Sequence, residues 1–239
     1  MSLQSVSKTI LVLETFLKFP GGRTSVSSLA RELGWSRAAT HQYMSTLAQS
    51  GWLQQSEDRE YQLSPRAAVF GRFAIEYSGA PPELSPVMES LVESLNEPIS
   101  YAVLNGNEAI ILERHEPRRP FTIAQANEPH LELRTSASGM VLLAFDAHVD
   151  ASRREGMEEE LATVRAQGYA QSHSKWLGDV VDVVAVPIMS RGECLGALSV
   201  IAPDGRLDVP RAREELIASR AEVERRISAS DALDDVPVR

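Results

Sequence analysis

The chain has 239 residues, enough for two domains, and 43% of them are hydrophobic, as is typical of globular proteins. It carries 24 basic and 33 acidic residues, which give a net charge of −9 at pH 7. Residues 1–80 contain eight basic and six acidic side chains, a charge of +2, so the remainder carries −11. This asymmetry excludes a uniformly basic protein and fits a nucleic-acid-binding N-terminal region on a body that phosphate does not attract.

The cysteine content and the lack of apolar runs exclude further classes of protein. Cys194 is the only cysteine, so the chain can form neither an intrachain disulfide nor a Cys-x-x-Cys metal or redox site. We expect its thiol to be buried and unreactive. No apolar run is long enough to span a membrane, and the N-terminus lacks the pattern of a signal peptide. We therefore expect a cytoplasmic protein without a membrane partner.

The first 63 residues predict a winged helix-turn-helix. Apolar residues at helical intervals indicate a helix over residues 5–19 and a second one that ends at Gly34. A third helix begins at Ser36 and stops at Gly51. Strand-like segments then flank a charged turn that ends at Arg59. Helix, tight turn, helix and wing together form a unit that reads DNA.

The third helix has the pattern of a recognition helix. Its inward face carries Thr40, Met44 and Leu47, while Trp35 in the turn is expected to wedge into the core. On the outward face, Arg37 suits a phosphate or a guanine, and Gln42 suits an adenine. Arg59 contacts the DNA backbone or the minor groove, or it is a solvated turn residue, and the whole unit could instead bind proteins. The candidate DNA contacts are Ser36, Arg37, Ala38, His41, Gln42, Ser45 and Arg59.

The remainder of the chain predicts a linker helix and an antiparallel α+β domain. Ser64-Pro65 opens the linker helix, and the run Gly79-Ala80-Pro81-Pro82 marks the domain boundary. Hairpin-paired strands with helices between them give the α+β class. The expected strands are 99–104, 109–113, 121–126, 180–189 and 193–201, and the expected helices are 84–95, 135–145, 150–167 and 208–228. The predicted domains are 1–63 (winged helix), 64–80 (linker), 81–230 (C-terminal domain) and 231–239 (disordered tail).

Several motifs occur in one order along residues 5–230. They are Leu29-Ala30-x-x-Leu33-Gly34-x-Ser36-Arg37, Thr135-Ser136-Ala137-Ser138-Gly139-x-x-Leu142-Leu143-Ala144 and Gly196-Ala197-Leu198-Ser199-Val200. In this order they resemble the isocitrate-lyase-regulator (IclR) family of bacterial transcription factors. The resemblance implies a winged-helix head, a linker helix and a GAF-like effector domain. It also implies dimers formed through the heads, often paired into tetramers, and a small organic acid as effector, commonly aromatic.

The chain departs from the family pattern at positions that bear on specificity. Gln42 stands where the family usually has Arg, which changes the expected DNA preference. Glu132-Leu133-Arg134 replaces a Pro-Leu-His lead, Met140 replaces a Lys, and residues 171–175 replace an acidic stretch. The last three changes surround the expected effector pocket, so the identity of the effector stays open.

The predicted effector site lies at the start of the helix over residues 135–145. Amides at a helix N-terminus favour an anion, the hydroxyls add donors, and Arg134 adds a cation. The alternatives are that Thr135 or Ser136 is an ordinary N-cap and that Arg134 is a solvated strand end. Asp182 either meets a hydroxyl of the ligand or faces water. The candidate residues are Arg134, Thr135, Ser136, Ser138, Asp182 and Ser199, with apolar contacts from Met140, Leu142, Val184 and Val186.

Catalysis has little support in the sequence. The segment Glu113-Arg114-His115-Glu116 holds acid and base groups, but it ends a strand and leads into a proline-rich loop. The five histidines show no metal-ligand spacing, and phosphate-loop and nucleophile-elbow motifs are absent. We therefore expect no enzyme activity, cofactor or metal, and predict a ligand-responsive regulator that binds double-stranded operator DNA as a dimer or tetramer. The alternatives are a winged-helix scaffold for proteins and an enzyme with a winged-helix appendage.

Overall fold

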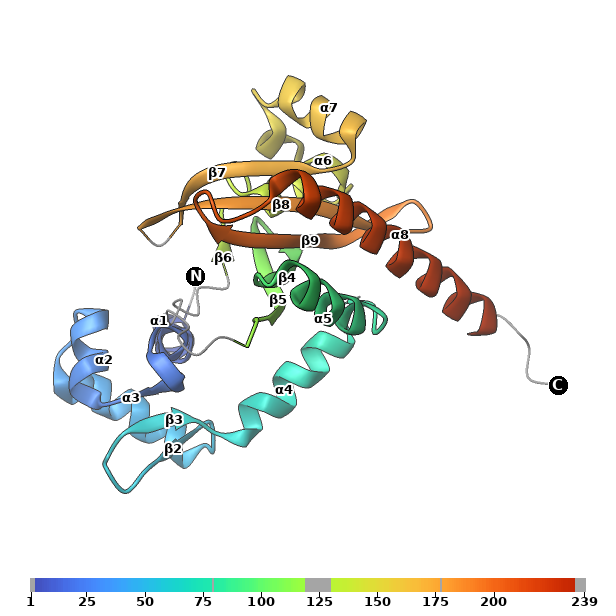
Figure 1. Cartoon of the computed structure of the whole chain (residues 1–239). Helices are drawn as coiled ribbons and strands as arrows, with labels where there is room; N and C mark the ends of the chain where they lie inside the picture. The colour runs from blue at the N-terminus through green and yellow to red at the C-terminus, as the bar shows by residue number, and fades with distance from the viewer. Residues whose placement is uncertain (1–2, 79, 119–129, 177, 235–239) are drawn as a thin grey trace. The chain divides into compact units, whose positions relative to one another are not determined.

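The computed structural model describes residues 3–78, 80–118, 130–176 and 178–234, and the chain divides into two compact units (Figure 1). The described part of the first unit ends at Ser78, and we call this unit the head. The second unit begins after it, and we call it the body. The described residues include no helix that is long and apolar enough to cross a membrane.

The head is a bundle of helices beside a small antiparallel sheet. Its core is formed by apolar side chains from the first three helices and the sheet, among them Val12, Phe16, Leu29, Met44 and Tyr61. The three strands lie in the order β1-β3-β2. The elements are α1 (Gln4–Thr15), β1 (Arg23–Thr24), α2 (Val26–Leu33), α3 (Arg37–Gln49), β2 (Leu53–Gln55), β3 (Tyr61–Leu63) and α4 (Pro65–Glu76).

Capping residues fix the turn between α2 and α3. Ser25 begins α2 by accepting a hydrogen bond from the Ser28 amide, at 3.2 Å. Gly34 ends α2 with φ +66°, a conformation that glycine adopts without strain. Ser36 then caps α3 by accepting from the Ala39 amide at 3.2 Å. The predicted helix-turn-helix is therefore closed by local hydrogen bonds at both helix starts.

The body is built on a six-stranded antiparallel sheet in the order β6-β5-β4-β9-β8-β7. Hairpins join β4 to β5, β7 to β8 and β8 to β9, while β4 pairs with β9 across a long crossover. The strands are β4 (Ile99–Asn105), β5 (Glu108–His115), β6 (His130–Leu131), β7 (Ala170–Trp176), β8 (Asp179–Ser190) and β9 (Glu193–Pro203).

Helices cover both faces of this sheet (Figure 1). The helices α5 (Leu84–Leu95) and α8 (Val209–Asp234) pack on one face, against side chains such as Val184. The helices α6 (Ala137–Phe145) and α7 (Glu158–Gln167) belong to a second core, which includes Ala185 from the other face. Consecutive residues of β8 thus face opposite cores, as the two-residue period of a strand requires.

The sheet curls toward α6. The Arg114 guanidinium of β5 lies 5.6 Å from the ring centre of Trp176 on β7. Strands β4, β9 and β8 separate β5 from β7 in the sheet order, so a flat sheet would keep these side chains far apart. By strand register, both side chains lie on the same face as Ala185, which packs toward α6. The α6 face is therefore concave, and we call it the concave face.

Several predicted boundaries were wrong. The first helix ends at Thr15 and continues as a 3-10 turn, and the helix expected over residues 150–167 is broken at Gly156, where φ is +74°. Strands β1, β6 and β7 were not predicted. Helix α6 begins at Ala137 rather than Thr135, and α8 runs past residue 230 to Asp234. The strand expected over residues 121–126 lies outside the described residues.

Candidate functional site

The outward face of α3 is polar and open to solvent. Thr40, Met44 and Leu47 are buried, which fixes the rotation of the helix about its axis. The side chains of Ser36, Arg37, Ala38, His41 and Gln42 are exposed, and Ser45 is half-buried. His41 and Ser45 lie on one face, since His41 Nε2 is 3.4 Å from Ser45 Oγ. The structure thus brings the predicted α3 residues together on one surface.

Trp35 anchors the turn before α3 on the core. Its ring centre is 5.4 Å from that of Tyr43, and the ammonium of Lys8 lies over the ring, 5.4 Å from its centre. Trp35 is half-buried against the head core, in agreement with the predicted wedge. It therefore joins α1, the turn and α3.

Arg59 lies in the turn between β2 and β3, which forms the wing. The turn is closed by a hydrogen bond from the Ser56 amide to the Glu60 carbonyl at 2.8 Å. Arg59 itself has φ +61°, a left-handed conformation uncommon for a residue with a side chain. Its side chain is exposed, which leaves the guanidinium open to solvent at the wing.

The start of α6 is occupied by local structure rather than by an open anion site. Ser136 is the N-cap: its oxygen accepts from the Gly139 amide at 3.0 Å, and its hydroxyl donates to the Glu132 carbonyl at 2.6 Å. Arg134 donates to the carbonyl oxygens of Arg153 and Glu155 at 3.1–3.2 Å. Ser136 and Arg134 thus hold the turn and the following loop, and Thr135 is exposed.

Asp182 lies on the opposite face of the sheet from α6. It shares its face with Val184 and Val186, which pack in the core with α5 and α8. The structure therefore does not bring Asp182, Val184 or Val186 together with Ser138 or Ser199. The sequence pattern placed these three residues on a common face correctly, but it could not say which helices cover that face.

Ser199 lies on the concave face together with two further serines, Ser100 and Ser172, and α6, which carries Ser138, packs on the same face. Ser138, in the first turn of α6, is 2% exposed. The Ser199 hydroxyl donates a long bond, 3.4 Å, to the Ser100 carbonyl. The hydroxyl of Ser172 on β7 is buried and has no hydrogen-bond partner among the described residues. An unpaired buried hydroxyl costs roughly 1–3 kcal/mol, which a bound polar group or water would offset.

A cation and an aromatic ring complete the concave face. The Arg114 guanidinium donates to Glu116 at 2.6 Å and to the Ser100 hydroxyl at 3.4 Å, and it stacks near Trp176. Sequence reasoning missed Ser100, Arg114, Ser172 and Trp176. The sequence did hold one signal for this face: Ser172 and Trp176 are four positions apart, so they share one side if residues 170–176 form a strand. Without the strand register, however, these two residues could not be connected to Arg114.

The acid and base groups of β5 do not form a catalytic relay. Glu113 and His115 lie inside the strand rather than in a solvated loop, which corrects the sequence interpretation. The Glu113 carboxylate is 2.6 Å from His115 Nε2, and the Ser85 hydroxyl is 3.4 Å from the same nitrogen. A relay needs the acid and the nucleophile on different ring nitrogens, so this arrangement does not activate Ser85.

The chain is similar to known proteins in the head and along most of its length. A family model for the IclR helix-turn-helix domain matches residues 5–57. The chain is 26% identical to the glycerol operon regulatory protein of Streptomyces coelicolor, with 95% of this chain and 96% of that protein covered. It is 21% identical to the transcriptional repressor IclR of Escherichia coli, with 89% and 84% covered.

A solved structure with the same fold is known in complex with a small acid. It is an IclR homologue from Microbacterium hydrocarbonoxydans bound to 4-hydroxybenzoate, which is 21% identical to this chain with a TM-score of 0.69. The match covers 94% of this chain and 99% of that one. At this identity the likeness establishes the fold of the chain.

Proposed function

We propose that the chain binds operator DNA through α3 and the wing, and that it releases or tightens this binding when a small organic acid occupies the body. The chain belongs to the IclR family of transcriptional regulators and is not an enzyme. The observation that carries the DNA part is the exposed polar face of α3, held in place by a buried opposite face. Since chromosomal DNA is the proposed partner, we propose a cytoplasmic location.

The base contacts are assigned to Arg37 and Gln42. An Arg suits guanine and a Gln suits adenine in the major groove, and each good contact is worth about 1–3 kcal/mol. Arg37→Ala combined with Gln42→Ala should therefore weaken specific binding by about 2–5 kcal/mol, measured by fluorescence anisotropy on a duplex that the full chain selects from random sequence. The fold should persist, since both side chains are exposed.

A matched control is Arg225→Ala combined with Gln171→Ala, two exposed residues of the same types in the body. It should leave DNA affinity unchanged. Equal affinity of the α3 double variant and the native chain would reject α3 as the reading helix.

For the effector, we infer that the concave face holds a small carboxylic acid, with an aromatic hydroxy acid as the leading subtype. The support is that the buried hydroxyls of Ser172 and Ser199 share the concave face with the Arg114 cation, and that α6, which carries the buried Ser138, packs on that face. Hydroxyl donors and a cation suit a carboxylate. The ring of Trp176 offers an aromatic surface next to the cation. The complex of the Microbacterium homologue with 4-hydroxybenzoate supports the same ligand class.

Calorimetry on the full chain against small aliphatic and aromatic acids tests this assignment. Ser172→Ala and Ser138→Ala should each weaken binding of a confirmed ligand by about 1.5–3 kcal/mol, since each removes one hydrogen bond to an anion. Ser90→Ala, an exposed serine of α5, should not. Binding of aliphatic acids alone would remove the aromatic subtype, and unchanged affinity in both variants would move the site away from the concave face.

The assembly that we propose is a dimer through the heads, with a pair of dimers as the larger alternative. Helices α1 and α4 expose more apolar surface than a small monomeric domain needs. The exposed side chains include Val6, Ile10 and Leu11 of α1 and Val69, Phe70 and Phe73 of α4. A two-fold dimer would place two copies of α3 on a palindromic operator.

A further inference from the structure

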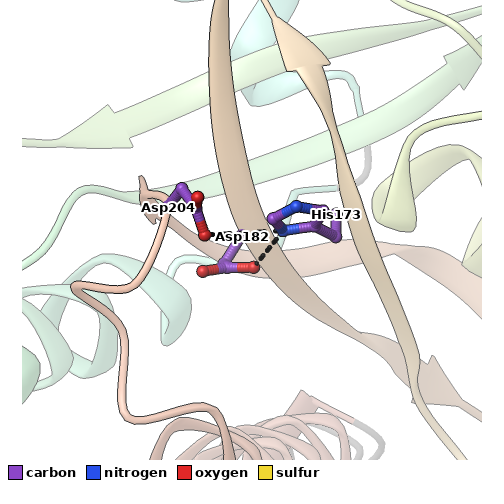
Figure 2. A group of neighbouring side chains, drawn as sticks. All are labelled: His173, Asp182 and Asp204. Carbon is purple, nitrogen blue, oxygen red and sulfur yellow. Dashed lines mark hydrogen bonds and ion pairs between the residues drawn. The ribbon is translucent and has the colours of Figure 1, made fainter.

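Three potential metal ligands meet at the edge of the sheet, on the face that α5 and α8 cover. His173 comes from β7, Asp182 from β8 and Asp204 from the turn that follows β9 (Figure 2). His173 Nδ1 is 2.8 Å from Asp182 Oδ1 and 3.9 Å from Asp204 Oδ1. Among the described residues, this group places one nitrogen and two carboxylate ligand atoms within 4.8 Å of one another.

The backbone holds two of these ligands in position. Residues His173 and Asp182 are directly paired across the β7–β8 ladder, so their side chains leave the same face of the sheet. The Gly205 amide donates to Asp182 Oδ2 at 3.1 Å, and Gly205 has φ +70°, which turns the chain so that Asp204 lies beside Asp182. The site is therefore set by strand register and a glycine turn rather than by flexible side chains alone.

Exposure differs among the three ligands in a way that suits an open metal site. The Asp182 side chain is 17% exposed, while those of His173 and Asp204 are 60% and 63% exposed. The half-buried Asp182 carboxylate gives a fixed anchor, and the two outer ligands face solvent. Water can then complete the coordination, as in zinc sites with three protein ligands.

We propose that His173, Asp182 and Asp204 bind a divalent transition metal ion, with Zn²⁺ as the reference ion. Ligand atoms about 2.0–2.2 Å from a tetrahedral zinc lie roughly 3.3–3.6 Å apart, and the observed separations of 2.8 and 3.9 Å lie on either side of this value. One imidazole and two carboxylates suit Zn²⁺ and its neighbours in the transition series. The bound ion would fasten the edge strand β7 to the turn before α8.

The site is separate from the concave face, because Asp182 and Ser172 point to opposite faces of the sheet. It therefore goes beyond the proposed effector binding.

The test uses the full chain after removal of metals with EDTA and desalting. Titration with ZnCl₂ in a calorimeter should give one ion per chain, and saturation should raise the melting temperature, because the ion binds the folded state. CoCl₂ should give the visible absorption of a protein-bound cobalt ion. His173→Gln and Asp204→Asn should each weaken Zn²⁺ binding at least tenfold, while the far-ultraviolet circular dichroism stays unchanged.

The matched control is His130→Gln. His130 Nδ1 lies 3.0 Å from Glu108 Oε2, so this pair has a histidine and one carboxylate, and no second carboxylate accompanies it among the described residues. The control variant should bind Zn²⁺ like the native chain. The proposal is overturned if the native chain does not bind Zn²⁺, if His173→Gln retains native affinity, or if His130→Gln abolishes binding.

Discussion

At Gly139, α6 lies directly against the backbone that precedes it. A Cβ atom at this position would lie 2.5 Å from both the Cα and the carbonyl oxygen of Leu133. Since these are backbone atoms, α6 would have to move to make room. We expect Gly139→Ala to destabilise the body by about 1–3 kcal/mol. Thermal melting followed by circular dichroism should show a decrease of several degrees.

Gly71 provides the control for Gly139. It also lies inside a helix, α4, but a Cβ there would meet no atom within 4 Å. Gly71→Ala should stabilise the helix by roughly 0.5–1 kcal/mol, because alanine loses less backbone entropy. If the two variants melted alike, the close contact between α6 and Leu133 would not be a determinant of stability.

Cys194 should be a poor nucleophile despite being the only thiol in the chain. Burial raises the pKa of the Cys194 thiol to about 11. At pH 8 only about a thousandth of the thiol would then be ionised, and the thiolate is the reactive form. Alkylation by iodoacetamide at pH 8 should therefore be far slower than in urea-unfolded chain, and it should accelerate as the pH approaches 11. Equal rates in the folded and unfolded chains would contradict the burial of this thiol.

At the scale of elements, the wing is expected to add a single phosphate contact. Arg59→Asn removes the charge and keeps the left-handed conformation, which Asn tolerates. The slope of log affinity against log salt should become shallower by about 0.9, the value for one phosphate contact on duplex DNA. Anisotropy titrations between low and moderate salt measure this slope.

Arg191 is the matched control for the wing. It is an exposed arginine with φ +49° in the β8–β9 turn of the body. Arg191→Asn should leave the salt slope unchanged. A slope that stays unaltered in Arg59→Asn as well would show that the Arg59 charge is only solvated.

Elements with strong periodicity were predictable from the sequence, and weakly patterned ones were not. Helix α5 was predicted with its correct bounds, because Leu84, Val87, Met88 and Leu91 repeat at helical spacing and all are buried. Strand β7 was missed because its residues alternate small, polar and charged types without β-branched side chains. Its place in the sheet comes from pairing with β8, which is tertiary information.

The same limit applies to the candidate sites. The α3 surface was predictable because all its residues lie on one helix, whose periodicity orients them. The concave face and the proposed metal site combine residues from separate segments of the sheet. Examples are Ser172 with Arg114 on the concave face and His173 with Asp204 in the proposed metal site. Histidine spacing along the chain could not reveal the cluster, since its ligands meet only through strand register and the turn at Gly205.

At the scale of the whole molecule, operator binding should depend on assembly. The side chains of Val69 and Phe73 are exposed on one side of α4, and burying such side chains stabilises an interface by roughly 1 kcal/mol or more each. Val69→Glu combined with Phe73→Glu would place two charges in the proposed interface. We expect analytical ultracentrifugation at micromolar concentration to change from dimer, or tetramer, to a smaller species.

The DNA consequence distinguishes an interface from a merely exposed patch. A monomer reads one half-site, so the double variant should lose most of its affinity for a palindromic duplex while it binds a single half-site like the native chain. Ala68→Glu, an exposed position about 100° around α4 from Val69, should leave both the mass and the affinity unchanged. If the native chain sedimented as a monomer, or if the double variant kept its full mass, the α1 and α4 surfaces would not be the contact. The palindrome would then have to be read through an interface formed by the bodies.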